Sequence, residues 1–226
     1  MKITTTCATL ALTLGLGSVA NAALVHAGTN GGSVTLVSVA GFGGVGTLAT
    51  VTDGGNGSAT ISGASDGNNT STGNGQVFTN DPGGFPSDYF GTTNVQAIVF
   101  DIDLGIALNL NSLAFWNRPG GNNAVQSFTA TFSADATIDG SDTSINFTAG
   151  NANGDQQDLA MADQLGIQFV RIAITDNFFG AAGGDGGGDR VGFTEFQFNE
   201  FTPIPEPSST ALLGLGGLAL ILRRRK

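Results

Sequence analysis

Side chains that commonly act as nucleophiles, general bases or zinc ligands are scarce in this sequence. The chain has 226 residues, with a single cysteine, Cys7, and a single histidine, His26. Ser–His and Cys–His catalysis needs a histidine beside the nucleophile, and zinc sites usually combine several histidines or cysteines. Neither arrangement has good candidates here, and we predict that the protein is not an enzyme.

Carboxylates, in contrast, are abundant: the sequence has 18 acidic residues and 8 Lys or Arg residues. Composition therefore allows a glycosidase that uses two carboxylates. Asp101 and Asp103 would lie on one face of a strand and could form such a pair. Two acids on a solvated face are much commoner, and nothing in the sequence places two acids in a cleft. A weak polysaccharide-active hydrolase is thus one alternative.

The charge distribution separates the two ends from the body of the chain. Five of the eight bases are Lys2 and the run 223–226. Residues 23–202 keep seventeen of the eighteen acids and three of the eight bases, which gives a net charge of −14. Such a surface repels phosphate backbones, so we exclude nucleic acid as a partner. The same surface attracts cations.

Residues 1–22 have the features of a secretory signal peptide. Lys2 precedes a segment of mostly apolar or small residues, and Ala20 and Ala22 give the small-x-small pattern that signal peptidase cleaves. A core helix is the other interpretation, which the position and flanks disfavour. Cleavage would remove Cys7, so the mature chain would depend on its core and not on disulfides.

The C-terminal segment, residues 203–226, combines three features. The tripeptide Pro205-Glu206-Pro207 comes first, the apolar run 211–222 follows, and the basic cluster 223–226 ends the chain. As a helix the run would be about 18 Å long, against a hydrocarbon core of about 30 Å, which is short for a permanent span. The basic cluster should stay cytoplasmic.

This tail closely resembles the PEP-CTERM sorting signal, which has a Pro-Glu-Pro motif, an apolar helix and an arginine-rich end in the same order. The resemblance implies a Gram-negative bacterium that makes exopolysaccharide. It also implies that an exosortase, a membrane-embedded cysteine transpeptidase, recognises the chain near Pro205, Glu206 and Pro207. The precursor would be held transiently in the inner membrane through the apolar helix.

The body between these ends is patterned as short strands. Charged residues are only 12% of the chain, which excludes a coiled coil or a long helical bundle. Apolar residues recur at period two: Ile98, Phe100, Ile102 and Leu104 share one predicted face. Such runs between Gly, Asn and Asp clusters predict an antiparallel sandwich or barrel. We expect one short helical turn, at Met161–Leu165.

A series of short segments occurs in the order seen in discoidin-like, galactose-binding-like domains, which the body resembles. The resemblance implies an all-β fold: an antiparallel jelly-roll β-sandwich of eight strands, with a core at about residues 64–200, inside a domain spanning 23–202. The segment Ala23–Ile61 would supply additional leading strands. The segments are Ala64–Asn68, Ile98–Gly105, Leu113–Arg118, Phe128–Asp135, Phe169–Ile172 and Val191–Phe198.

The resemblance also implies a structural calcium ion. Discoidin-like domains often hold Ca²⁺ between an Asp-Gly-Asn loop and a carboxylate of the last strand, and the matching residues here are Asp66, Asn68, Thr70 and Glu195. Hard oxygen ligands and the surplus of acids suit Ca²⁺. The family's hydroxyl ligand usually follows the aspartate by five residues, whereas Thr70 follows Asp66 by four and Ser71 by five, so either hydroxyl could be the ligand. An ordinary Asx turn with a solvated Glu195 is the other interpretation.

Glycan binding is implied by the same resemblance. Asn117 and Arg118 occur as in fucose-binding lectins of this fold, but the aspartate and second base of that motif are replaced by Gly120 and Val125. The fucose site therefore does not carry over. Trp116 and Arg118 remain the candidate glycan-binding residues, and a strand-end tryptophan covering the core is the alternative.

Together these observations predict a non-catalytic protein of the cell envelope or extracellular matrix, processed by signal peptidase and exosortase and associated with exopolysaccharide or other glycans. The mature form would lie at the cell surface or outside the cell. A purely structural matrix component without a defined ligand is the first alternative, and the hydrolase is the second.

Overall fold

The computed structural model describes residues 23–38, 51–52, 61–70, 77–79, 90, 98–119, 121–152, 154–179 and 191–202. The predicted cleavage residues Ala20 and Ala22 and the whole predicted tail, with Pro205, Glu206 and Pro207, lie outside these ranges. Within them, no helix has both the length and the apolar character needed to cross a membrane.

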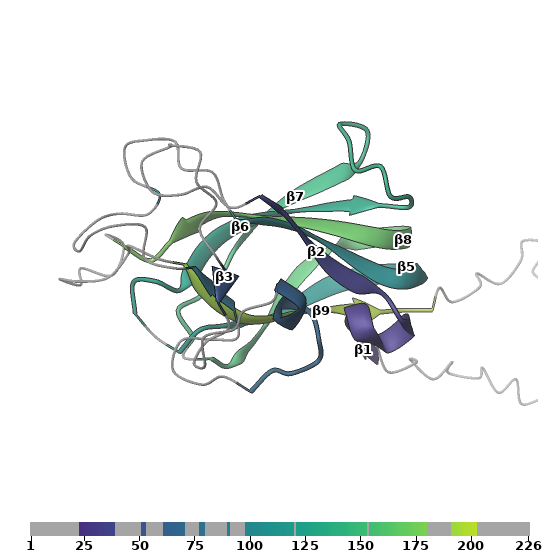
Figure 1. Ribbon diagram of the computed structural model, residues 1–226. Helices are drawn as coiled ribbons and strands as arrows, with labels where there is room; N and C mark the ends of the chain where they lie inside the picture. The colour runs from purple at the N-terminus through teal and green to yellow at the C-terminus, as the bar shows by residue number, and fades with distance from the viewer. Residues whose placement is uncertain are drawn as a thin grey trace, which may run out of the picture.

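The described residues form β-strands and two short 3-10 helices (Figure 1). Every pairing between these strands is antiparallel, which confirms the predicted antiparallel β-sandwich. The elements are β1 (Ala23–Val25), η1 (Ala27–Asn30), β2 (Ser33–Ser38), β3 (Val51–Thr52), η3 (Ile61–Ala64), β4 (Val77–Thr79), β5 (Val99–Asn117), β6 (Val125–Ser133), β7 (Thr143–Thr148), β8 (Gln156–Asn177) and β9 (Gly192–Glu200).

Two long strands, β5 and β8, take part in both layers of the sandwich. Near its start, β5 pairs with β2 and with the second half of β8, which continues to β6 and β7. Further along, β5 pairs with the first half of β8 and with β9, which continues to β4 and β3. We call these the front layer (β2-β5-β8-β6-β7) and the back layer (β8-β5-β9-β4-β3).

The long strands bend where they pass from one layer to the other. The pairing of β5 with β8 shifts register between Asp103 and Ser112. Gly105 and Gly166 have φ angles of 79° and 68° in this region, a conformation that residues with a Cβ rarely adopt. The predicted helical turn at Met161–Leu165 is therefore wrong: this segment lies inside β8 and leads into the bend.

The first strand joins the end of the last one. Ala23 pairs with Glu200 and Val25 with Phe198, on the edge of β9 that faces away from β5. The prediction that residues before Ile61 add strands is thus confirmed for β1 and β2. The two ends of the described body lie side by side at one pole of the sandwich (Figure 1).

Phenylalanine rings fill the space between the layers. Phe196 of β9 lies at the centre of the cluster, and its ring centroid is 4.6 Å from that of Phe115 and 5.1 Å from that of Phe128. The predicted inward face of β5 is confirmed, because Ile98, Phe100, Ile102 and Leu104 are fully buried. Burying such side chains is the main term that stabilises the sandwich.

A buried asparagine ties strand ends together at the pole opposite Ala23. Asn117 Nδ2 donates to the carbonyl of Val125 (2.7 Å), and its Oδ1 accepts from the Val125 N–H (2.9 Å). Its carbonyl accepts from Thr194 Oγ1 at 3.1 Å. These bonds satisfy polar groups that burial would otherwise leave unpaired, and they fix the backbone of Arg118 that follows.

Candidate functional site

The structure brings the 66–70 loop and Glu195 together across 129 positions of sequence. Glu195 Oε1 accepts a hydrogen bond from the Gly67 N–H at 2.8 Å, and Oε2 accepts from the Asp66 N–H at 3.3 Å. Gln197 Nε2 adds a third donor at 3.4 Å. Glu195 is fully buried, unlike the solvated residue of the alternative interpretation.

Burial makes this carboxyl a weak acid. Desolvation is the largest influence, the nearby charge of Asp66 acts in the same direction, and together they raise the pKa of Glu195 to about 8 despite the hydrogen bonds from the loop. A cation held between the two carboxyl groups would offset both effects. The two backbone donors and the Gln197 amide are uncharged, and they leave the carboxylate of Glu195 poorly compensated.

The other predicted ligands, Asp66, Asn68 and Thr70, lie in one exposed loop and are linked by hydrogen bonds within it. Asp66 Oδ1 accepts from the Asn68 N–H at 2.8 Å, and Asn68 Oδ1 accepts from the Thr70 N–H at 3.2 Å. These are successive Asx turns, as the alternative interpretation expected. The donor set of carboxylate, amide and hydroxyl oxygens fits a hard cation. Among the described residues, no group of three or more His, Cys, Asp or Glu side chains could hold a metal ion.

Two residues that sequence reasoning did not select hold this loop in place. Ser65 is buried, donates to the Phe196 carbonyl at 2.7 Å and accepts from the Ala27 N–H at 3.3 Å. His26 caps η1 by accepting from the Gly28 N–H at 3.2 Å. Its ring lies against Gly67, where a Cβ would come within 2.7 Å of Nε2. The only sequence signal was that His26 is the sole histidine.

The candidate glycan residues lie at the Asn117 pole. The ring of Trp116 is only 4% exposed, so in this structure it cannot provide a platform for a sugar. This burial agrees with the alternative of a structural tryptophan at a strand end. Arg118 is half-buried, and its N–H donates to Asn117 Oδ1 at 3.1 Å.

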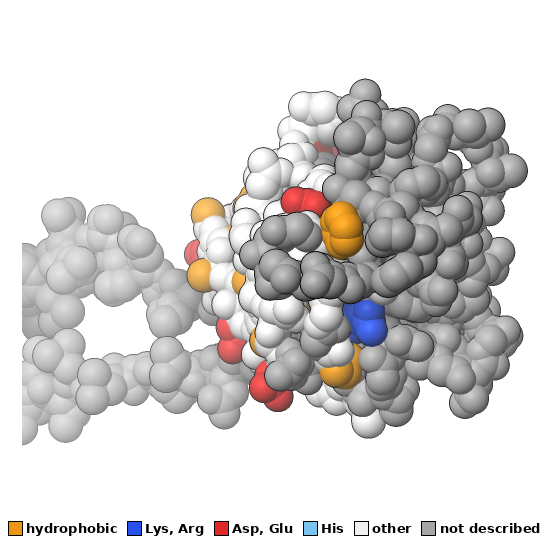
Figure 2. Space-filling model, turned by 90° about the vertical axis from the view of Figure 1, so that its left-hand side faces the viewer, with side chains coloured by type: hydrophobic (Ala, Val, Ile, Leu, Met, Phe, Trp, Pro, Cys, Tyr) orange, Lys and Arg blue, Asp and Glu red, His pale blue; other side chains and the backbone are white. Residues whose placement is uncertain are grey.

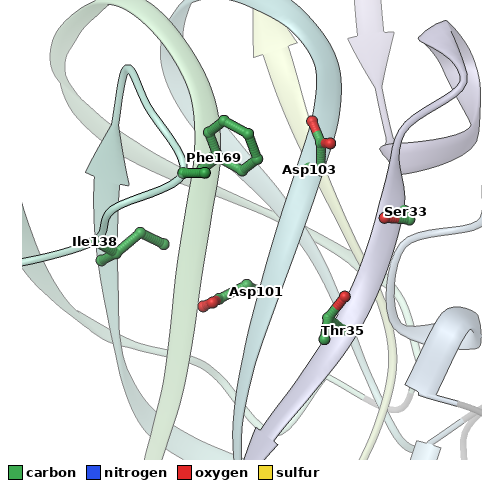
Figure 3. Close-up of a pocket in the computed structure, with 7 residues that line it drawn as sticks. Ser33, Thr35, Asp101, Asp103, Ile138 and Phe169 are labelled. Carbon is green, nitrogen blue, oxygen red and sulfur yellow. The ribbon is translucent and has the colours of Figure 1, made fainter.

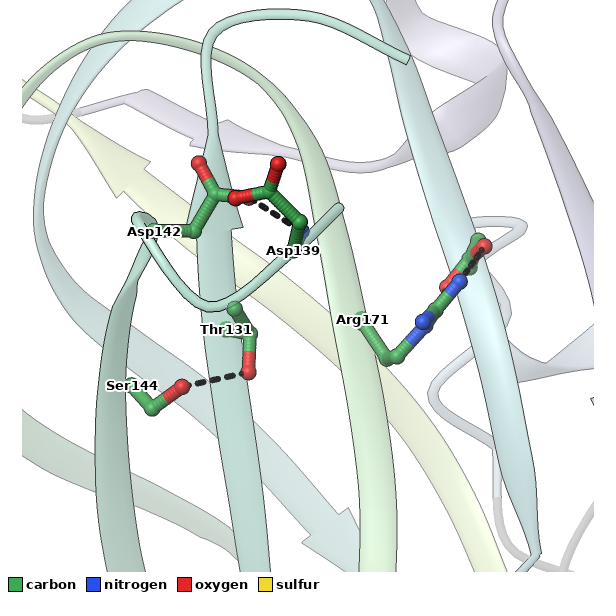
Figure 4. Close-up of polar contacts among 6 residues, drawn as sticks. Thr131, Asp139, Asp142, Ser144 and Arg171 are labelled. Carbon is green, nitrogen blue, oxygen red and sulfur yellow. Dashed lines mark hydrogen bonds and ion pairs between the residues drawn. The ribbon is translucent and has the colours of Figure 1, made fainter. Parts of the chain in front are cut away.

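Asp101 and Asp103 lie on the outer face of the front layer and have different partners. Asp101 forms a two-pronged ion pair with Arg171, at 2.7 Å to Nε and 2.8 Å to the second nitrogen (Figure 4). Asp103 Oδ1 accepts from the Gly105 N–H at 2.8 Å and from Gln168 Nε2 at 3.1 Å. Both aspartates line one pocket together with hydroxyl and apolar side chains (Figure 3).

The described surface agrees with the acidic composition. In Figure 2, acidic side chains are spread over the described part of one face among uncharged ones. Neighbouring surface groups are linked by hydrogen bonds. On the front layer, Thr131 Oγ1 and Ser144 Oγ are 2.8 Å apart, and in the loop between β6 and β7 the Asp139 N–H donates to Asp142 Oδ2 at 2.8 Å (Figure 4). Hydrogen bonds from the Ser141 side chain and backbone lower the pKa of Asp139 below its usual value.

Solved structures similar to this one include three bacterial domains. The family 32 CBM of C. perfringens NanJ, solved with galactose, has a TM-score of 0.43 and 16% identity, over 66% of this chain and 89% of that one. The C-terminal domain of a chitobiase from Bacteroides fragilis has a TM-score of 0.45 and 16% identity, over 80% and 100%. CBM62 of Clostridium thermocellum Xyl5A has a TM-score of 0.42 and 14% identity, over 75% and 94%.

No curated protein sequence matches this chain. A family model does match its end, in agreement with the proline, apolar and basic features noted there. Residues 203–226 are a PEP-CTERM protein-sorting motif.

Proposed function

We propose that this is an exported, non-catalytic protein of the cell envelope or extracellular matrix that associates with exopolysaccharide. The observation that carries the proposal is the PEP-CTERM motif at residues 203–226, attached to a body that folds as a β-sandwich. In this account signal peptidase cleaves after Ala22, and an exosortase acts near Pro205, Glu206 and Pro207. The mature form lies at the surface or outside a Gram-negative cell.

Three features of the body support association with a neutral polymer. Its net charge of −14 over residues 23–202 disfavours acidic ligands. The outer face of the front layer carries hydroxyl, amide and carboxyl groups in hydrogen-bonding rows. The resemblance to discoidin-like domains adds an expectation of glycan binding.

The processing part of the proposal predicts the termini of the mature protein. Mass spectrometry of the protein from its native envelope and culture medium should find a chain that starts at Ala23 and lacks residues 223–226. A Glu206→Ala variant should accumulate as a cell-bound precursor, whereas a Ser208→Ala variant, two positions further on, should be processed normally. A mature product that keeps both the first 22 residues and the basic end would contradict export and sorting.

A structural calcium ion between the 66–70 loop and Glu195 is the second part of the proposal. The ligands would be oxygens of Asp66, Asn68, Thr70 and Glu195, and bound Ca²⁺ would fix the loop on β9. At a hundredfold excess over its Kd, calcium should raise the melting temperature at pH 8 by about 5–10 °C.

Thermal unfolding with and without Ca²⁺ tests this site. Mg²⁺ should act much more weakly, because it prefers a smaller octahedral site. An Asp66→Asn variant should lose most of the calcium response, whereas Asp155→Asn, which changes an exposed aspartate just before β8, should keep it. An unchanged melting temperature for the unmodified chain would eliminate the calcium site and leave the export proposal standing.

A further inference from the structure

The outer face of the front layer carries a row of polar side chains that runs across all five strands. Strand register aligns Thr35 of β2 with Asp101 of β5, Arg171 of β8, Thr131 of β6 and Ser144 of β7. On β5, β8 and β6 the residues that alternate with the members of this row are buried in the core, so the row lies on the solvent side. This row is therefore polar from one edge of the front layer to the other.

The neighbouring row on the same face contains an aromatic ring. It consists of Ser33, Asp103, Phe169 and Ser133, two residues away along each strand. Phe169 alternates with the fully buried Val170, so its half-buried ring lies on the outer face. An aromatic ring among hydroxyls and carboxylates has no role in the core of the sandwich.

A pocket of about 240 Å³ lies between these two rows (Figure 3). Its floor comes from β2 and β5, the ring of Phe169 lies on the β8 side, and Ala136 and Ile138 of the loop between β6 and β7 form a wall. Strand spacing places the hydroxyls of Ser33 and Thr35 opposite the two aspartates in a rectangle of about 5 by 7 Å. This volume is below the usual range for drug-sized ligands, about 300–1,000 Å³, and suits one small ring.

The two aspartates leave one negative charge in the pocket. Arg171 neutralises Asp101 through the two-pronged ion pair. Asp103 has no cationic partner among the described residues, and both of its hydrogen bonds use Oδ1. The outer oxygen of Asp103 can therefore accept hydrogen bonds from a ligand, and an anionic ligand would be repelled.

We propose that this pocket is a binding subsite for one neutral pyranose unit of a polysaccharide. Phe169 packs against the apolar C–H face of the sugar, as aromatic rings do in ligand pockets. Asp103 Oδ2 accepts hydrogen bonds from ring hydroxyls, and Ser33 and Thr35 donate to or accept from them. The site lies on a sheet face, away from the loop-end residues Trp116 and Arg118, and it rests on the proposed association with glycans.

Affinity electrophoresis of the full chain tests the subsite. Native gels would contain dextran, galactomannan or xyloglucan as neutral probes, with alginate as the acidic probe. At least one neutral polymer should retard the protein, and alginate should not. Phe169→Ala and Asp103→Asn should each weaken retention about tenfold or more. Asn at position 103 can still accept from the Gly105 N–H, so the local turn is kept.

Two control variants make the result specific. Leu165→Ala removes an apolar side chain that is 64% exposed at the bend and lies outside the pocket, and it should leave retention unchanged. Arg118→Ala tests the loop-end site, and retention within twofold of the unmodified chain supports the sheet-face subsite. Circular dichroism of each variant establishes that it folds.

Different results would overturn the subsite and the proposed glycan association. If Arg118→Ala abolishes retention while both pocket variants bind like the unmodified chain, the subsite is overturned and glycan association survives. If no neutral polymer retards the unmodified chain, both the subsite and the proposed glycan association are overturned. Retention by alginate that survives in Asp103→Asn would overturn the neutral-sugar assignment.

Discussion

Replacing Phe196 with alanine is expected to lower the free energy of unfolding by about 4 kcal/mol, in the range measured for buried Phe-to-Ala changes in other proteins. The side chain is fully buried, and its ring contacts those of Phe100, Phe115, Phe128 and Phe193 at centroid distances of 4.6 to 5.8 Å. These rings come from both layers, so the cavity would open in the core between the two layers.

Denaturant titration followed by far-UV circular dichroism measures this loss. Phe196→Leu keeps part of the volume and should cost clearly less than the alanine change, which keeps the test usable if Phe196→Ala does not fold. Phe169→Ala is the matched control, because its ring is half-exposed on the outer face; its cost should be about 1 kcal/mol or less. Equal losses for Phe196→Ala and Phe169→Ala would contradict the central position of Phe196.

Stability without calcium should fall as the pH rises from about 4.5 to about 8, and Glu195 is the cause. Burial raises the pKa of Glu195 from its ordinary value of 4.5 to about 8 in the folded state. Between these values the folded chain holds a proton that the unfolded chain releases, so the contribution is fully present below pH 4.5 and is lost by about pH 8. The loss is of the order of 4 kcal/mol.

Chemical denaturation in a calcium chelator at several pH values measures this slope. Glu195→Gln removes the titrating group and should flatten the profile, so that above pH 8 the variant is more stable than the unmodified chain. Glu200→Gln, at the end of the same strand, is the control and should keep the slope. A profile of the unmodified chain that is flat or rises over pH 5–8 would show that Glu195 is not a protonated buried acid.

The strands were predictable because their burial follows period two. The predicted inward set of Ile98, Phe100, Ile102 and Leu104 is confirmed, because all four side chains are fully buried. The bend of β5 and β8 was not predictable, because a glycine that allows a positive φ looks the same in sequence as one in a loop. Met161–Leu165 was therefore assigned to a helical turn although it extends a strand.

The candidate sites were harder to predict from the sequence than the strands were. The pairing of Asp66 with Glu195 followed only from resemblance, since no local pattern links residues 129 positions apart. The burial of Trp116 depends on what packs over it, which composition does not report. The sheet-face pocket needs the register of β2, β5 and β8, and register is fixed by the whole layer. The local signal of that surface was the pair Asp101 and Asp103 on one face of a predicted strand, which gave no indication of the residues opposite them.

The pairing of Ala23 with Glu200 has a consequence for how the protein is displayed. The first and last strands of the body lie side by side at one pole of the sandwich. A precursor held in the membrane by its signal peptide and one held by its C-terminal segment would therefore expose the same opposite pole. Cleavage of either segment therefore need not change the orientation of the sandwich. The Asn117 pole would point away from the membrane throughout maturation. The outer faces of the two layers, with the sheet-face pocket on the front layer, would then be roughly perpendicular to the membrane.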